Sequence, residues 1–243
     1  MKKKILIMMM ALVLVLSACG KKETETVKET TKETDVNTTE ETNATNDTKE
    51  TENNKPDMSG EVTYEKLMSI PPTPLEEFEW SNTPEGDIAL GVYKGEDPMV
   101  YIADEYDGKK VVKISGLAYN HNPYVKAIRL GKNLKELGQG AFGTNEVLEI
   151  FVSEGLEIIE RDAFNSAKAL RDVRLNEGLK EIKNSAFAGL GENITEIVIP
   201  KSIESITPGA FFHNPNLVIK GYAGTPTKEA AEASGIKYEE IKE

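Results

Sequence analysis

The sequence predicts a β-rich solenoid built from short repeats, and two observations indicate this fold. First, one apolar pattern recurs along the chain, with a second apolar residue three positions after the first and an Ala-aromatic pair four positions later. The copies are Leu134–Phe142, Leu156–Phe164, Leu179–Phe187 and Ile203–Phe211, with a weaker one at Val111–Tyr119. Second, their aromatic residues recur at nearly even spacing, at positions 119, 142, 164, 187 and 211. Self-similarity at such a period is typical of solenoids.

Each repeat also contains an apolar segment of the form L-x-x-L-x-L, the strand of a leucine-rich repeat. These segments are Val125–Leu130, Val147–Val152, Leu170–Leu175 and Ile194–Ile199. The distance from the start of each segment to the next Phe is constant, whereas the distance from an aromatic residue to the following segment varies. We therefore expect the variation in period to lie in a surface loop after the aromatic residue.

A competing interpretation places Leu134, Leu137 and Ala141 on one face of a helix and predicts a repeat of two helices. Glycines at 138 and 140 and the Pro208-Gly209 pair disfavour long helices, and the period is too short to hold two of them. A leucine-rich repeat with parallel strands and short helical or 3₁₀ turns is favoured.

The repeat unit resembles the BspA-like leucine-rich repeat family of bacterial surface proteins, whose hallmark is an apolar strand followed by L-x-x-I-x-x-x-A-F. The resemblance covers about residues 86–241. It implies a parallel-strand solenoid that recognises or adheres to a host, neighbouring-cell or matrix protein. It also implies a terminal strand, helix and strand at the end of the chain.

The N-terminus has the features of a bacterial lipoprotein signal peptide, predicted at residues 1–18. Three lysines precede an apolar run, Ile5–Leu16, that is too short for an ordinary membrane span. The following Leu-Ser-Ala-Cys19 resembles a lipobox, in which the cysteine becomes diacylated and the chain is cut before it. Acyl chains on Cys19 would anchor the protein to the outer face of the cell membrane. The alternative is an ordinary signal peptide with an incidental cysteine.

The segment 19–57 is predicted to be a disordered tether. Residues 20–57 contain 11 Thr, 11 acidic residues and 6 Lys, and no aromatic residue. Such a composition cannot bury enough apolar surface to offset the entropy lost on ordering. A tether of this length would lift the folded part away from the membrane.

Residues 58–110 are predicted to form an N-terminal packing segment and cap, since a bare solenoid end exposes core and unpaired backbone. We expect 61–80 to be irregular and packed against the start of the folded domain, with a partner-binding role as the alternative. Residues 88–93 and 99–102 alternate as a strand, turn and strand, which we expect to form an N-terminal hairpin that caps the solenoid, and Asp107-Gly108 marks a tight turn. The repeats would then occupy 111–220.

The final segment, 221–243, is predicted to be the C-terminal cap. Pro226 suits the first turn of a helix and Gly235 suits its end.

The composition argues against nucleic-acid binding, metal chemistry and catalysis. The net charge of −12 repels nucleic acid. The chain has two His and one Cys, so an internal disulfide is impossible and no cofactor or metal site is expected. His121 and His213 both occur in His-Asn-Pro after a repeat aromatic, where we expect turns. No acid-His or acid-acid spacing indicates an enzyme, and only the region before the repeats leaves that class open.

A binding surface is predicted on the outward face of the strands, where one residue lies between two buried ones. One column there mixes aromatic, cationic and apolar residues of the kind that anchor protein interfaces: Tyr101, Arg129, Phe151, Arg174 and Val198. A second column, which begins at Ala127, is acidic: Glu149, Asp172 and Glu196. The alternative is that the arginines only neutralise these neighbouring acids.

The sequence as a whole predicts a lipid-anchored, non-enzymatic surface protein that displays a leucine-rich-repeat binding module. Its partners would be the membrane, through Cys19, and an unidentified protein ligand. The alternative is an accessory envelope component that binds cell-wall polymer or organises other secreted proteins.

Overall fold

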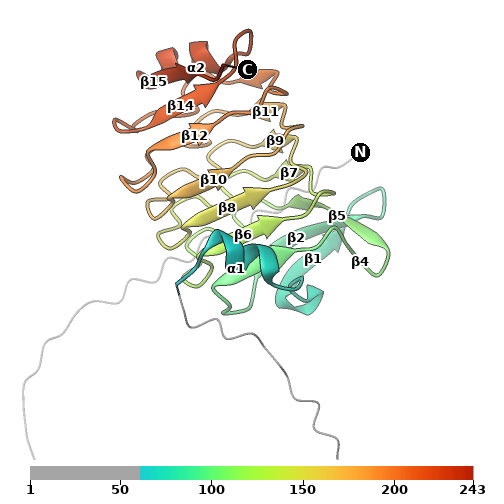
Figure 1. Ribbon diagram of the computed structural model, residues 1–243. Coiled ribbons are helices and arrows are strands. Elements are labelled where there is room, and N and C mark those ends of the chain that lie inside the picture. Colours follow the sequence, from blue (N-terminus) through green and yellow to red (C-terminus); the bar gives the residue numbers. More distant parts are fainter. Residues whose placement is uncertain (1–60, 243) are drawn as a thin grey trace, which may run out of the picture. The chain divides into compact units, whose positions relative to one another are not determined.

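The computed structural model describes residues 61–242. The predicted signal peptide, Cys19 and the tether lie outside these residues. Within them, no helix is both long and apolar enough to cross a membrane. The chain winds through successive coils, each of which adds one strand to either side of a shared core (Figure 1).

One side of the solenoid carries the L-x-x-L-x-L strands of the repeats and the equivalent strands of the first and last coils, all of them parallel to their neighbours. They form a four-stranded sheet and a three-stranded sheet, and no strand pairing joins the two among residues 61–242. We call the outer surface of both sheets the strand face. Its strands are β3 (Met99–Ile102), β6 (Ala127–Leu130), β8 (Ile150–Ser153), β10 (Asp172–Arg174), β12 (Glu196–Val198), β14 (Val218–Gly221) and β15 (Lys237–Glu240).

The other side is a sheet in which the L-x-x-I motif of each repeat supplies a short parallel strand. These strands are β7 (Glu136–Leu137), β9 (Ile158–Ile159), β11 (Glu181–Ile182) and β13 (Ser205–Ile206). They continue β5 (Lys109–Ile114) and β2 (Ile88–Tyr93) in order. The motif is therefore extended rather than helical, which confirms the leucine-rich repeat over the helical-pair interpretation.

The predicted aromatic positions stack through the core. Tyr119, Phe142, Phe164, Phe187 and Phe211 have no exposed surface, and the centroids of successive rings lie 4.8 to 5.7 Å apart. The stack continues towards the N-terminus through Tyr93 and Phe78. Offset aromatic stacking adds to the free energy of area burial, so neighbouring coils are fixed in register by their largest side chains.

The N-terminal hairpin differs from the expected one. β2 and β3 are strands as predicted, but they lie in different sheets and already form part of the first coil. The hairpin is instead made by β1 (Phe78–Asn82), which pairs antiparallel with β2. A second tight hairpin joins β4 (Glu105–Tyr106) to β5. Its turn is Asp107-Gly108, with φ angles of 50° and 74°, as predicted.

Residues 61–80 are not irregular, so that prediction was wrong. They contain the helix α1 (Tyr64–Ser69), a 3₁₀ turn (Leu75–Glu77) and β1. The hydroxyl of Thr63 caps α1 by accepting a hydrogen bond from the Lys66 amide at 3.3 Å. The helix stops at Ile70 because the residue before a proline favours extended backbone, and Ile70 has ψ 148°.

The C-terminus has the expected strand, helix and strand. α2 (Thr227–Ala233) follows Pro226, and Gly235 takes a positive φ of 69° just after it. Ala230, Ala231 and Ile236 are buried in the solenoid core, so this unit covers the last coil.

The register of β8 corrects the predicted repeat spacing. Ile128 of β6 pairs with Phe151, and Leu130 pairs with Ser153, so Leu148 and not Val147 corresponds to Val125. The interval from Phe142 to Leu148 then equals the interval from Tyr119 to Val125. This repeat is shorter by one residue because the turn between Ser153 and Leu156 is shorter than its equivalent in the preceding coil. The turn is so tight there that a Cβ on Gly155 would lie 1.9 Å from the Lys132 carbonyl oxygen.

Candidate functional site: the strand face and the helix that covers it

The strand registers define two columns of residues that point outward on the strand face. The first column is Met99, Ala127, Ile150, Asp172, Glu196, Val218 and Lys237, and the second is Tyr101, Arg129, Val152, Arg174, Val198, Lys220 and Glu239. The N-terminal half of this face is therefore largely apolar, and the C-terminal half is largely charged.

Helix α1 lies across the apolar half (Figure 1). Its Leu67 has no exposed surface, and Val62 just before the helix is 3% exposed. Both pack against Met99, Ala127, Ile150 and Val152, in a cluster separate from the solenoid core. These four side chains face away from the core, so it is α1 that keeps them from water.

Two arginines of the neighbouring coil hold the start of this segment. The Nη2 group of Arg171 donates a hydrogen bond of 2.8 Å to the Val62 carbonyl, across 109 residues of sequence. The guanidinium of Arg174 lies 3.5 Å from the centroid of the Tyr64 ring, a close cation–π contact. Apolar burial and two cationic contacts therefore seat the segment 62–70.

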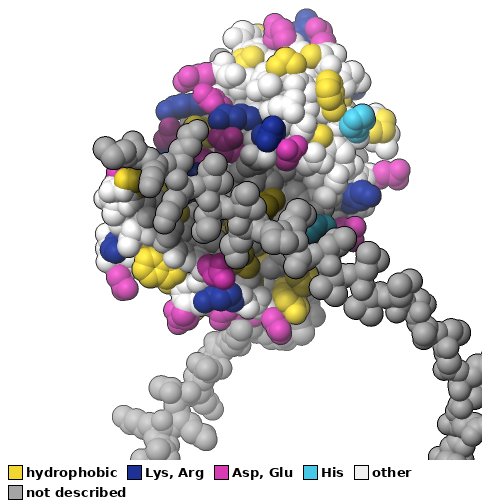
Figure 2. Space-filling model, turned by 180° about the vertical axis from the view of Figure 1, so that it is seen from behind, with side chains coloured by type: hydrophobic (Ala, Val, Ile, Leu, Met, Phe, Trp, Pro, Cys, Tyr) yellow, Lys and Arg dark blue, Asp and Glu magenta, His cyan; other side chains and the backbone are white. Residues whose placement is uncertain are grey.

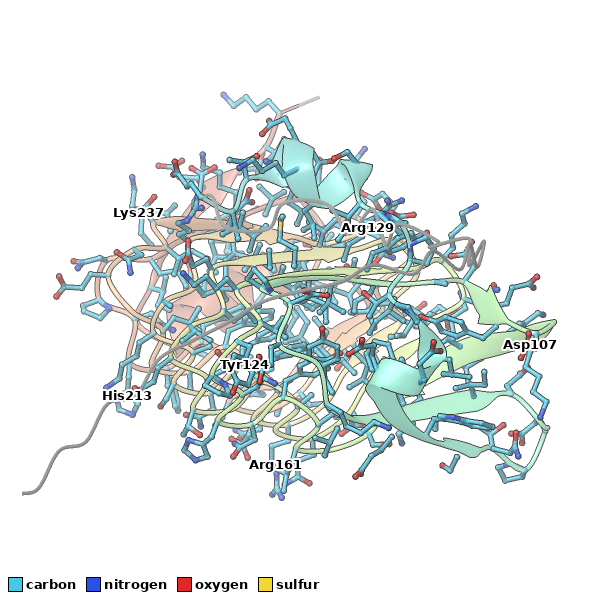
Figure 3. The ribbon with its side chains drawn as sticks, turned by 90° about the horizontal axis from the view of Figure 1, so that it is seen from below. Asp107, Tyr124, Arg129, Arg161, His213 and Lys237 are labelled. Carbon is cyan, nitrogen blue, oxygen red and sulfur yellow. The ribbon has the colours of Figure 1, made fainter. Side chains whose placement is uncertain are left out.

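Three residues predicted for the binding face are already engaged within the chain. Tyr101 accepts a backbone hydrogen bond from Thr73 at 2.8 Å, and the Arg129 guanidinium lies 4.2 Å from its ring. Arg129 also donates to the Glu154 carboxylate. Arg174 forms a bidentate pair with Asp172, and this hydrogen bond raises the pKa of Arg174. Viewed from below, Arg129 lies on the side that α1 covers, opposite Arg161 (Figure 3).

The prediction that Phe151 faces outward was wrong. Phe151 is fully buried, with its ring edge-on to Phe142 and Phe164 at centroid distances of 5.9 and 4.7 Å. The register of β8 differs by one position from the predicted register. A shift of one position exchanges the two faces of a strand, so Phe151 points into the core. Phe151 and the buried Ser153 fill the space that Ile128 and Leu130 occupy in the preceding coil.

Glu149 is displaced from the predicted acidic column by the same shift. Ile150 takes its place between Ala127 and Asp172. Glu149 instead accepts a hydrogen bond of 3.0 Å from the Arg171 Nε. The acidic column is therefore reduced to Asp172 and Glu196, and Ile150 is one of the apolar residues that α1 covers.

The remaining predicted residues lie on the C-terminal half. Val198 is 40% exposed, and Glu196 accepts a hydrogen bond of 2.6 Å from the Lys220 ammonium. Asp172 is paired with Arg174, as the alternative interpretation expected, whereas Glu196 is paired with Lys220 rather than with an arginine. In the rear view, too, lysines and arginines lie beside acidic side chains (Figure 2).

Sequence reasoning missed the residues that make the apolar half of the face. They are Met99, Ile150, Val152, Arg171 and, from the covering segment, Val62, Tyr64 and Leu67. One signal was present in the sequence. The L-x-x-L-x-L segments that follow Tyr119 and Phe164 begin at the same distance from those aromatic residues. The same distance after Phe142 starts the segment at Leu148, which turns Ile150 and Val152 outward.

The described residues show no arrangement typical of a metal centre. Within 61–242, no three His, Cys, Asp or Glu side chains are grouped to hold a metal ion. His121 and His213 occupy turns with φ angles of 54° and 64°, as predicted. The neighbouring asparagines explain the His-Asn-Pro motif, because Asn122 Oδ1 accepts hydrogen bonds from the Tyr124 and Val125 amides and Asn214 Oδ1 accepts one from the Leu190 amide.

Comparison with solved structures places the fold among bacterial leucine-rich repeat proteins. A leucine-rich repeat protein from Bacteroides ovatus matches with a TM-score of 0.51 and 24% identity, over 60% of this chain and 40% of its own length. The T. pallidum leucine-rich repeat protein TpLRR matches with a TM-score of 0.46 and 21% identity, over 62% of this chain and 71% of its own length. No curated protein sequence matches the chain.

The repeats themselves match a family model. Residues 107–218 match the BspA type leucine rich repeat region in six copies. The matched range contains the motifs, short strands and aromatic stack described above. Residues 107–218 of this chain are therefore a BspA-type leucine-rich repeat region.

Proposed function

We propose that this protein is a protein-binding module, displayed on the outer surface of a bacterial cell by lipid on Cys19, and that it recognises or adheres to a polypeptide ligand through its strand face. The observation that carries the proposal is the seating of α1. A segment that belongs to no coil buries aliphatic side chains on this face and receives contacts from Arg171 and Arg174. The face thus has the chemistry to hold a polypeptide.

The C-terminal half of the face is the part that is open to an external ligand. Val198 is exposed on β12 and lies between Glu196 and the neighbouring lysine, Lys220. An exposed apolar residue among charged neighbours resembles the centre and rim of a protein interface. The match of residues 107–218 to the BspA type leucine rich repeat region also supports a binding role.

The test uses the mature full chain as bait against surface proteins of host and neighbouring cells, followed by titration with each purified candidate. Val198→Arg should weaken saturable binding at least tenfold. Phe212→Arg is the matched control, because Phe212 is also 40% exposed but lies in the loop after the last stacked Phe. Equal binding by the Val198→Arg chain would contradict the assignment to this face.

The wild-type and Val198→Arg chains also test the alternative that the protein is an accessory envelope component. An envelope component would co-sediment with purified peptidoglycan, and the Val198→Arg change would not matter. That outcome, without a saturable protein ligand, would replace the present proposal.

A further inference from the structure

The apolar half of the strand face is buried, although it lies on the outside of the solenoid and no coil of the solenoid covers it. Met99, Ala127, Ile150 and Val152 are each at most 5% exposed, although they point away from the solenoid core. Contiguous apolar surface of this kind marks an interaction site when it is uncovered. The question is whether the segment that covers it is a permanent part of the fold or an occupant.

The solenoid edge is closed without α1. The outermost strand of this sheet, β3, is paired by Thr73, whose amide donates to the Tyr101 carbonyl and whose hydroxyl accepts from the Tyr101 amide at 3.1 Å. The Tyr106 hydroxyl donates to the Thr73 carbonyl at 2.5 Å. Since this edge contact comes after Pro71 and Pro72, α1 can leave the face while Thr73 stays in place.

Few contacts fix α1 to the strand face, and they are confined to one side of the helix. The helix has six residues, and a helix of that length is unstable in water without tertiary contacts. Only Val62 and Leu67 of this segment are fully buried, whereas Glu65, Lys66 and Ser69 face solvent. A segment with few buried contacts opens at a lower free-energy cost than the coils beneath it.

The two arginines keep their positions without α1. Arg171 is paired with Glu149 at 3.0 Å, and Arg174 is paired with Asp172 at 2.9 Å. Neither pair includes a residue of α1. When α1 lifts, an apolar patch remains, bordered by guanidinium groups that are oriented for a carbonyl oxygen and an aromatic ring.

We propose that the face of β3, β6, β8 and β10 is a docking site for a short amphipathic helix, and that α1 is its resident occupant, displaced when a partner helix of the same chemistry binds. The partner helix presents two aliphatic side chains to the Ile150 and Val152 patch, an aromatic ring to Arg174 and a carbonyl oxygen to Arg171. This inference deepens the proposed function by naming the ligand class and the segment that competes with it.

The probe is a fluorescent peptide with the sequence of residues 61–70, measured by fluorescence polarisation with three forms of the full chain. The wild-type chain should bind it weakly because its own α1 occupies the face. Leu67→Glu, which places a charge where a buried leucine packs, should release α1 and tighten peptide binding at least tenfold. Adding Ile150→Glu to that variant should abolish the gain.

Glu65→Gln is the matched control on the exposed side of α1 and should bind as weakly as the wild type. Failure of the released Leu67→Glu chain to bind the peptide overturns the docking site. Concentration-dependent dimerisation of the wild-type chain through this face would also overturn it, because α1 would then be exchanged between copies rather than held within one chain.

Native-state hydrogen exchange tests the occupant independently, including the case in which Leu67→Glu does not fold. The Leu67 amide, which donates to Thr63, should exchange through a local opening much faster than the paired amides of β6 and β8. Exchange of the Leu67 amide only upon global unfolding would overturn the proposal. Both measurements probe only the half of the face that α1 covers, so the proposed function can survive their failure through the C-terminal half, which the Val198→Arg experiment tests.

Discussion

At the scale of the residue, one of the five repeat positions in the aromatic stack carries a polar group. Tyr119 occupies the position that phenylalanine holds at 142, 164, 187 and 211. Its ring has no exposed surface, and its hydroxyl has no hydrogen-bond partner among the described residues. Burial raises the pKa of Tyr119 well above its ordinary value, so the phenol stays neutral. Desolvating this hydroxyl opposes folding, while the ring itself stabilises the first full coil.

We expect Tyr119→Phe to stabilise the protein by about 1 kcal/mol, because it removes an unpaired buried hydroxyl and keeps the ring. Chemical denaturation at equilibrium measures the change in the free energy of unfolding. The reverse substitution in the next coil, Phe142→Tyr, serves as the comparison and should destabilise. A loss of stability in Tyr119→Phe would mean that the hydroxyl has a partner, such as a buried water.

At the scale of the element, β8 is followed by a turn that is one residue shorter than in the preceding coil, and its register decides which side chains face outward. Its run Ile150-Phe151-Val152 is apolar at every position, so hydrophobic pattern alone permits either face to be buried. The shortened turn before Leu156 and the aromatic stack select the register that buries Phe151. Ile150 and Val152 then face outward, and their exposure would be unfavourable without α1.

Phe151→Ala should therefore cost about 3–5 kcal/mol of stability, as expected for a buried aromatic that leaves a cavity. Val198→Ala, at an exposed position on β12, should change stability by less than about 0.5 kcal/mol. Equilibrium denaturation of both variants decides the register: near-equal, small effects would place Phe151 on the surface.

At the scale of the whole molecule, the solenoid gives the chain a rigid surface, and the N-terminal residues are proposed to place it on a cell. The net charge of −12 keeps it from anionic polymers, and charged side chains of the described residues form ion pairs between successive coils, such as Lys180 with Glu157 and Lys183 with Glu160. Glu157 also contacts Lys135, and the hydrogen bonds from Lys180 and Lys135 lower the pKa of Glu157. Ion pairs of this kind link successive coils along the surface of the solenoid.

The anchor is tested in the intact chain. Cys19→Ala should release the protein from the membrane fraction and prevent labelling by a fatty-acid analogue, because no other residue of the predicted signal region carries a thiol. Ser17→Ala, a small-residue change beside it, is the control and should leave both unchanged. A membrane-bound, normally processed Cys19→Ala protein would rule out the lipid anchor on this residue.

Sequence alone determined the repeat architecture, because the fold places equivalent residues of successive coils in contact and periodicity reports those contacts directly. The stacked aromatics, the short strands of the L-x-x-I motif and the C-terminal cap all follow from residues that lie within about one repeat of each other. Tertiary structure decided which residues form the strand face and what covers it. The packing of α1 depends on contacts such as that of Val62 with Arg171, 109 residues apart, and so short a helix has no periodic signal to announce them. The orientation of Phe151 likewise needed the neighbouring coils, since their stacked rings and the short turn before Leu156 select between two registers that the apolar run of β8 allows.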